Sequence, residues 1–308
     1  MAETLIANVS DTAFWVAHYR AVESERPDAL FRDPLAKVLA GDRGKAIAES
    51  VPVSFFTRQV LAIRTCIIDD YIRFALAQGI DAVVNLGAGL DTRPYRMDLP
   101  SNLLWVEADY PQVVEYKEQR LSRESPRCRL ERAPVNLANA DERRDLLDNI
   151  RTRTTKVMIL TEGVIPYLSV EEVGPLADDL KAIDRVVYWI VDYHSPRIVK
   201  LRRRFGVQRQ MQNAPFRFTP PDWFGFFRKH GWYASEVRYL PEEAERLKRP
   251  IQIPLRYQLF LKVLGLFRSK KQREEFRKLS GYVMLAPGAG SDIRERVGGE
   301  VEAAAEPS

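Results

Sequence analysis

Cysteine and histidine are scarce in this 308-residue sequence. Two cysteines, Cys66 and Cys128, cannot build a disulfide framework or a thiolate metal site, and three histidines without paired spacing argue against a zinc enzyme. We therefore expect a reduced, cytoplasmic protein that holds no metal. Long apolar runs are also lacking. The longest one, residues 255–267, is interrupted by Arg256 and Lys262 and is too short to cross a bilayer. The first residues show no signal-peptide pattern.

Charge is unevenly distributed along the chain. The net charge is +5, but residues 197–278 contain 21 basic and only 7 acidic side chains, so the remainder is acidic. Such a basic segment suits an anionic substrate, a membrane surface or nucleic acid, and it also fits a solvated basic helical face. Because no nucleic-acid-binding motif accompanies the charge, we expect no nucleic-acid partner. Contact of residues 255–278 with a membrane surface remains an open alternative.

Apolar runs begin to alternate with helical patterns after residue 79. The expected strands are 81–86, 103–106, 130–135, 157–160, 186–191, 233–239 and 282–285. Strands that alternate with helices predict an α/β fold with a mostly parallel sheet, and runs that are apolar throughout indicate strands covered on both faces. We interpret residues 1–79 as a helical N-terminal cap and 80–286 as the sheet domain. A helical insertion is expected at 240–279 and a disordered tail at 287–308.

Small and acidic residues follow the expected strands directly. Gly87 and Gly89 follow the first strand, and glycine lets the backbone turn sharply and approach a ligand. Asp109 follows the second strand, where a carboxylate is placed to accept two hydrogen bonds from a ribose diol. In an open parallel sheet, ligands bind beyond these strand ends. The pattern predicts a cofactor that contains a nucleoside.

The loop after the first strand does not complete a phosphate-binding fingerprint. A third glycine would be expected, but position 92 is Thr92, which argues against a dehydrogenase that uses NAD. Asp91 and Glu162, which follows the fourth strand, would also repel a phosphate. A cofactor with an adenosine and a cationic end suits these residues better. S-adenosylmethionine carries both a sulfonium and an ammonium group, and it is the cofactor that we expect.

Several motifs resemble the leucine carboxyl methyltransferase family, in particular its bacterial branch of S-adenosylmethionine-dependent O-methyltransferases, often linked to polyketide and other secondary metabolism. The matching segments, in order, are 12–24 (TAFWVAHYRAVES), 33–36 (DPLA), Arg64-Thr65, 84–96 (VNLGAGLDTRPYR), 107–111 (EADYP) and 162–168 (EGVIPYL). The resemblance implies the seven-stranded, Rossmann-like sheet of class I methyltransferases, with residues 282–285 as an antiparallel strand inserted near one edge.

The resemblance also implies roles for individual residues. Arg64 would bind the carboxylate of the cofactor, and Gly87 would lie against its methionine portion. Asp109 would hold the ribose, and Glu162 would lie near the aminoacyl and sulfonium end. The resemblance places the pair that contacts adenine, Asp-Leu in the family, at Asn136-Leu137 here. An asparagine oxygen still accepts a hydrogen bond from the adenine amine.

The methyl acceptor is less clearly indicated than the cofactor. We expect a small metabolite with a carboxylate or a hydroxyl group; a carboxylate needs no general base, whereas a hydroxyl does. His194, after the fifth strand, and Tyr167 are the tentative catalytic candidates. One alternative is methylation of the C-terminal carboxylate of a protein. Another is a non-catalytic scaffold that recruits a partner or a membrane through the basic C-terminal third.

Overall fold

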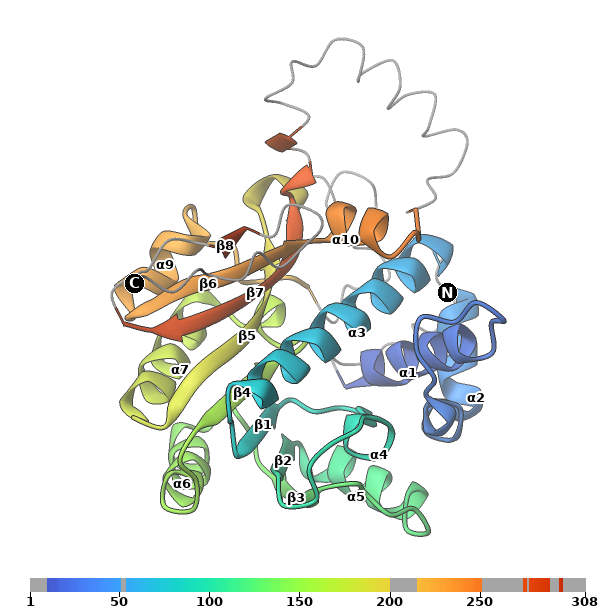
Figure 1. Ribbon diagram of the computed structural model, residues 1–308, viewed down its shortest axis with the longest axis horizontal. Coiled ribbons are helices and arrows are strands. Elements are labelled where there is room, and N and C mark those ends of the chain that lie inside the picture. Colours follow the sequence, from blue (N-terminus) through green and yellow to red (C-terminus); the bar gives the residue numbers. More distant parts are fainter. Residues whose placement is uncertain are drawn as a thin grey trace, which may run out of the picture.

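A single twisted sheet organises the protein, as the computed structural model shows (Figure 1). The structure describes residues 10–50, 54–199, 215–250, 274–275, 277–288 and 294–295. The strands lie in the order β3-β2-β1-β4-β5-β7-β6-β8. Their bounds are β1 Ala82–Leu86, β2 Leu104–Asp109, β3 Arg129–Pro134, β4 Val157–Thr161, β5 Val186–His194, β6 Trp232–Tyr239, β7 Ser280–Pro287 and β8 Arg294–Glu295.

Strand direction follows the expectation from the sequence. Strands β1 to β5 pair in parallel, and β7 is antiparallel to both of its neighbours, β5 and β6. The seven-stranded sheet with one inserted antiparallel strand is therefore confirmed. The structure adds the two-residue strand β8, which pairs with β6 inside the segment expected to be a disordered tail. Apart from 287–288 and β8, that tail lies outside the described residues.

Helices cover both faces of the sheet. Their bounds are α1 Asp11–Ser24, α2 Pro34–Ser50, α3 Ser54–Ala77, α4 Arg93–Arg96, α5 Pro111–Arg120, α6 Ala140–Arg151, α7 Val170–Ala182, α9 Trp223–Lys229 and α10 Leu240–Arg246, with a short 3₁₀ turn η1 Ile165–Tyr167. Helices α3 and α10 pack on one face through a buried cluster that includes Ile67, Val83 and Trp105. Alternate strand residues point to opposite faces, so Val84 enters the cluster on the other side.

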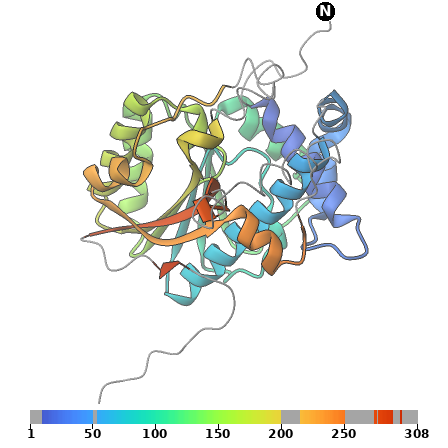
Figure 2. The same ribbon diagram turned by 90° about the horizontal axis from the view of Figure 1, so that it is seen from above.

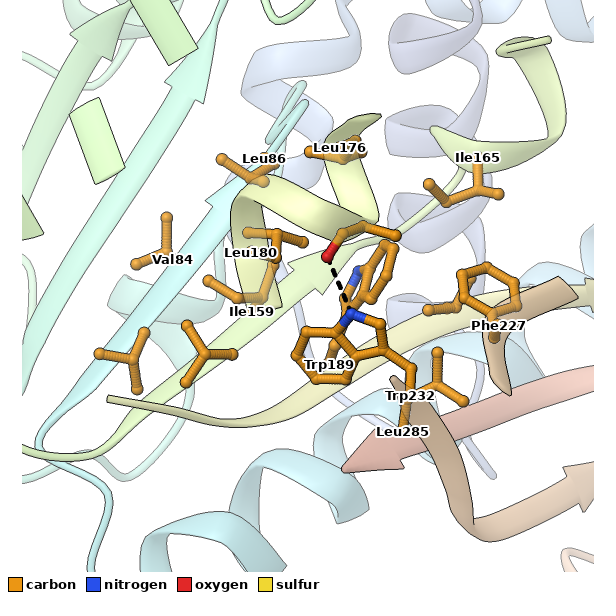
Figure 3. Packing of buried hydrophobic residues seen from close by; sticks show 14 of the residues in the cluster. Val84, Leu86, Ile159, Ile165, Leu176, Leu180, Trp189, Phe227, Trp232 and Leu285 are labelled. Carbon is orange, nitrogen blue, oxygen red and sulfur yellow. Dashed lines mark hydrogen bonds between the residues drawn. The ribbon is translucent and has the colours of Figure 1, made fainter. Parts of the chain in front are cut away.

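The second face carries the larger aromatic core, beneath α6, α7 and α9 (Figure 3). Trp189 and Trp232 are fully buried there, with ring centroids 5.3 Å apart in an edge-to-face arrangement. The indole Nε1–H of Trp232 donates to the carbonyl of Ala177 at 2.9 Å, which ties β6 to α7. This bond stabilises the core, because the indole N–H of Trp232 would otherwise be a buried donor without a partner.

The N-terminal helices lie at one side of the sheet, away from α7 and α9 (Figure 2). Helices α1 and α2 pack against each other, and α2 bends at Gly41, where φ is +51°. Helix α3 belongs instead to the hydrophobic core of the sheet. In the expected insertion at 240–279 the structure shows α10 at its start, whereas residues 251–273 lie outside the described part. The proposed membrane-contacting segment 255–278 therefore falls almost entirely outside it.

Candidate functional site

The loops after β1, β2 and β4 meet at the carboxyl edge of the sheet. Strand β1 lies between β2 and β4, so the chain order reverses at β1, and ligands bind at such switch points in open parallel sheets. Gly87 and Gly89 have φ angles of +71° and +50°, which favour glycine. A Cβ atom on Gly87 would lie only 2.4 Å from Cγ2 of Val164. The backbone after β1 therefore passes close to the loop after β4.

Asp109 joins the end of β2 to this glycine loop. Its Oδ2 atom accepts the N–H of Gly89 at 2.6 Å, and its Oδ1 atom accepts the N–H of Tyr110 at 2.7 Å. Burial raises the pKa of this carboxyl group, although the two N–H donors oppose the rise. Each carboxylate oxygen has a second lone pair, so Asp109 can also accept the hydroxyls of a ribose. Gly89 and Asp109 were predicted separately as site residues, and a hydrogen bond joins them in the structure.

Arg64 and Glu162 form an ion pair on the other side of the glycine loop. The Nε atom of Arg64 on α3 lies 2.7 Å from Oε1 of Glu162, and Arg93 reaches Oε2 of the same carboxylate at 2.7 Å. Burial disfavours the charged form of Glu162, but the two arginines outweigh burial and hold its pKa below the ordinary value. The structure therefore brings Arg64 and Glu162 together. An arginine beside a carboxylate can receive the carboxylate and the ammonium of an amino acid.

A buried ionic network supports this pair, and none of its contacts was predicted from the sequence. Arg93, 1% exposed, also contacts Asp69 on α3 at 2.7 Å and Asp91 in the glycine loop at 3.0 Å. Asp69 in turn binds Arg96 at 2.7 Å. Because each carboxylate faces a guanidinium, the network keeps charged groups buried without leaving them unpaired. It fixes α3, the glycine loop and Glu162 relative to one another.

The N-terminal cap reaches the same loop. Arg20 on α1 donates to the carbonyl of Leu90, and its Nε lies 3.0 Å from Oδ2 of Asp33. Asp33 is completely buried and accepts the hydroxyl of Thr92 at 2.6 Å. The threonine that replaces a third glycine therefore anchors the loop to the cap.

Asp192 is a further buried carboxylate beside Arg64. It lies near the end of β5, is 4% exposed, and accepts the N–H of Gly163 at 2.8 Å. Tyr282 on β7 is its partner across the antiparallel pair. Asp192 was not among the predicted site residues, although it ends an apolar run just as Glu162 does. That position was the signal that could have identified it.

The predicted adenine contacts, Asn136 and Leu137, follow β3 next to the end of β2. The N–H of Val135 donates to the carbonyl of Asp109 at 2.8 Å, so the pair lies beside the ribose candidate. The amide oxygen of Asn136 accepts the N–H of Ala138 at 3.1 Å. Contact with adenine stays a prediction. The residues after β3 lie beside Asp109, as that contact requires.

His194 and Tyr167 are linked through a third ring. The ring centroid of Phe216 lies 5.0 Å from that of His194 and 5.4 Å from that of Tyr167, both in edge-to-face geometry. We call these three residues the aromatic row. His194 ends β5 and Tyr167 ends η1, so the row borders the site formed by Glu162 and Asp192. Their catalytic roles stay predictions.

Metal ligation and membrane insertion find no support in the described part of the chain. No group of three or more His, Cys, Asp or Glu side chains there could hold a metal ion. Among the helices that the structure describes, none has the length and apolar character that spanning a bilayer requires.

Sequence comparison identifies the family. The family model described as leucine carboxyl methyltransferase matches residues 13–181, which include the glycine loop, Asp109 and the Arg64–Glu162 pair. The chain belongs to the leucine carboxyl methyltransferase family. A Parafrankia relative is 31% identical over 264 residues, 80% of this chain and 83% of that protein, and one from Streptomyces avermitilis is 30% identical over 260 residues, 79% and 89% respectively. Both are named as S-adenosyl-L-methionine-dependent methyltransferases.

A solved structure supports the fold. A methyltransferase from Thermobifida fusca superimposes with a TM-score of 0.53 at 14% identity, covering 89% of this chain and 94% of its own. This member of the leucine carboxyl methyltransferase family is an S-adenosylmethionine-dependent methyltransferase. The comparisons therefore favour an enzyme over a non-catalytic scaffold, and they favour a methyltransferase over a dehydrogenase that uses NAD. The residues present fit the cofactor, because the carboxylate of Asp109 can accept a ribose diol and Arg64 and Glu162 match a zwitterionic end.

Proposed function

We propose that this enzyme transfers a methyl group to the carboxylate or hydroxyl oxygen of a small molecule. The observation that carries the proposal is the aromatic row, which lies next to Glu162 and Asp192 at the ends of β4 and β5. Three rings in edge contact offer a rigid apolar surface, which suits an acceptor with an aromatic or apolar skeleton.

Helix α1 borders the same side and favours a small acceptor. Tyr167 packs against a buried cluster that contains Trp15, Tyr19 and Leu61. Trp15 and Tyr19 come from α1, so an acceptor placed along the aromatic row lies beside the N-terminal cap. A molecule enclosed between a helix and the strand ends loses contact with water, which strengthens the electrostatic interactions that hold it.

The proposed chemistry needs positioning more than acid or base. When bound, S-adenosylmethionine supplies a methyl group on a positively charged sulfur, and the departing thioether needs no proton. The residues of the chain then act by holding the acceptor oxygen in line with that methyl group, an effect worth about 7–11 kcal/mol in favourable cases. A carboxylate acceptor needs nothing further. A hydroxyl acceptor has to lose a proton, and His194 is the candidate that receives it.

Methylation of the C-terminal carboxylate of a protein is the second candidate, and the name of the leucine carboxyl methyltransferase family favours it. The two candidates differ in where the methyl group is found. The experiment supplies the enzyme with methyl-tritiated S-adenosylmethionine, a panel of phenols and carboxylic acids, and separately a set of peptides with free C-termini. Methyl esters release methanol in mild base, whereas methyl ethers do not.

We expect label in the low-molecular-weight fraction and a large loss of transfer in the Tyr167→Ala variant. Asp81→Asn serves as a control distant from the site, because Asp81 accepts the backbone N–H of Lys156 at 2.8 Å and precedes β1 at the opposite edge of the sheet. Label found only on peptides as base-labile esters would contradict the small-molecule proposal and support the second candidate.

A further inference from the structure

Asp192 is held in place by the loop that carries Glu162. Its Oδ2 atom accepts the N–H of Gly163 at 2.8 Å, and Gly163 has a φ angle of +69° directly after Glu162. Across the sheet, Asp192 on β5 pairs with Tyr282 on β7. Asp192 is thus attached to three elements, β5, β7 and the loop after β4, and its side chain cannot turn away without breaking the bond to Gly163.

Arg64 is the cation that this carboxylate faces. The Nε of Arg64 lies 2.7 Å from Glu162, and a Cβ on Gly163 would lie 3.4 Å from Nη1 of Arg64. Asp192 attracts the same guanidinium, and the hydroxyl of Tyr282 is hydrogen-bonded to it. Arg93 and Arg96 pair with Asp69 and Asp91, and Arg93 also reaches Glu162 at 2.7 Å. In this cluster four carboxylates face three guanidinium groups, so Asp192 leaves one negative charge in excess.

We propose that Asp192 is a positioning and specificity-determining residue that makes the site favour S-adenosylmethionine over the product S-adenosylhomocysteine. The two ligands share the adenosine and the amino-acid end. They differ in the sulfur, which is positively charged before methyl transfer and neutral afterwards. The excess negative charge that Asp192 contributes next to Arg64 and Glu162 attracts the charged ligand and not the neutral sulfur. This inference rests on the cofactor that the family uses, and it is independent of the methyl acceptor proposed above.

The protonation state of Asp192 makes the inference testable. Burial raises the pKa of Asp192 to about 6, Arg64 and the N–H of Gly163 oppose the rise, and Glu162 adds to it. The groups that face Asp192 are Arg64 from α3, Glu162 and Gly163 from the loop after β4, and Tyr282 from β7. Asp192 is therefore ionised at pH 7 and mostly protonated at pH 5, so the preference for the charged ligand falls in acid.

The experiment compares the dissociation constants of S-adenosylmethionine and S-adenosylhomocysteine by calorimetry at pH 5, 6 and 7. Burial also raises the pKa of Asp109, but the ribose that it would bind is common to both ligands, so any effect of Asp109 cancels in the ratio of the two constants. For the native chain we expect the preference for S-adenosylmethionine to increase about fivefold or more between pH 5 and pH 7, the size of a typical coupling between charges. In Asp192→Asn the ratio is expected to be independent of pH, whereas Asp81→Asn behaves as the native chain.

Stability of the ligand-free protein separates this role from a purely structural one. A carboxyl whose pKa is higher in the folded than in the unfolded state destabilises the fold as pH rises through the window between the two values, here from about 4 to about 6. Asp192→Asn removes that decline, so its thermal midpoint at pH 7.5 should equal or exceed that of the native chain. An equal loss of affinity for both ligands would indicate a merely structural role and overturn the proposal.

The proposal for Asp192 would also be overturned if the ratio of the two dissociation constants did not change with pH in the native chain. This measurement needs no variant. Failure of the proposed methyl acceptor would instead appear as normal binding of both ligands without methyl transfer to any small molecule. The two failures are therefore distinguishable.

Discussion

The close approach of Gly87 to Val164 allows a quantitative test of the site. In Gly87→Ala, alanine must adopt a φ angle of +71°, which costs about 1–2 kcal/mol in the left-handed region. The new Cβ also lies 2.4 Å from Cγ2 of Val164, and such overpacking costs about 1–3 kcal/mol. The two contributions are physically independent, so we expect the free energy of unfolding to fall by about 2–5 kcal/mol.

A double-mutant cycle separates the two contributions. Val164→Ala removes Cγ2, and the remaining Cβ of residue 164 lies 3.7 Å from the added atom, an ordinary contact. Gly87→Ala combined with Val164→Ala should therefore regain about 1–3 kcal/mol relative to the sum of the single changes, leaving the backbone contribution and the separate cost of truncating Val164. Urea unfolding of the four proteins measures this coupling. A coupling energy below about 0.5 kcal/mol would refute the contact between the loops after β1 and β4.

Three further predictions concern the cofactor, the core and the thiols. Asp109→Asn should weaken binding of S-adenosylmethionine and S-adenosylhomocysteine equally, by about 10- to 150-fold in calorimetry, because charge-assisted hydrogen bonds contribute about 1.5–3 kcal/mol. Trp232→Phe should lower the free energy of unfolding by about 1–3 kcal/mol in urea titrations, because the carbonyl of Ala177 loses its indole donor. Burial raises the pKa of Cys66 to about 12 and that of Cys128 to about 11, so both should react with a disulfide reagent at pH 8 much more slowly than the same thiols in urea. Rapid labelling of the folded protein would contradict that expectation.

The sheet could be predicted because a short apolar run in the sequence indicates the position of each strand. Strand β4, expected at 157–160, extends over Val157–Thr161, and every one of its residues is buried. Strand β3 is the least regular case: it was expected at 130–135 and is found at Arg129–Pro134. None of its residues is fully buried, since its four central residues are half-buried and its two end residues are exposed. Short apolar runs between turn residues give the position of a strand, and the uncovered edge strand gives a weaker signal.

From residue patterns alone the site was predicted only where residues follow strands directly, whereas Arg64 on α3 was assigned from the family resemblance. Gly87, Asp109 and Glu162 were identified because parallel strands place their carboxyl ends at one edge. The partners of these residues depend on tertiary packing instead. Arg93 pairs with Asp69 because α3 lies across the sheet, and no spacing in the sequence indicates that contact.

The antiparallel strand β7 has a consequence for how the protein is made. Tyr282 lies beside Arg64 and opposite Asp192, yet it is encoded more than 200 positions after Arg64. While the ribosome is still synthesising the region before β7, β5 has no partner on one side and β6 has none at all in the sheet. A nascent chain can therefore assemble the ribose side of the site, at β1 and β2, early. The amino-acid side is complete only when β7 inserts between β5 and β6, which are synthesised before it.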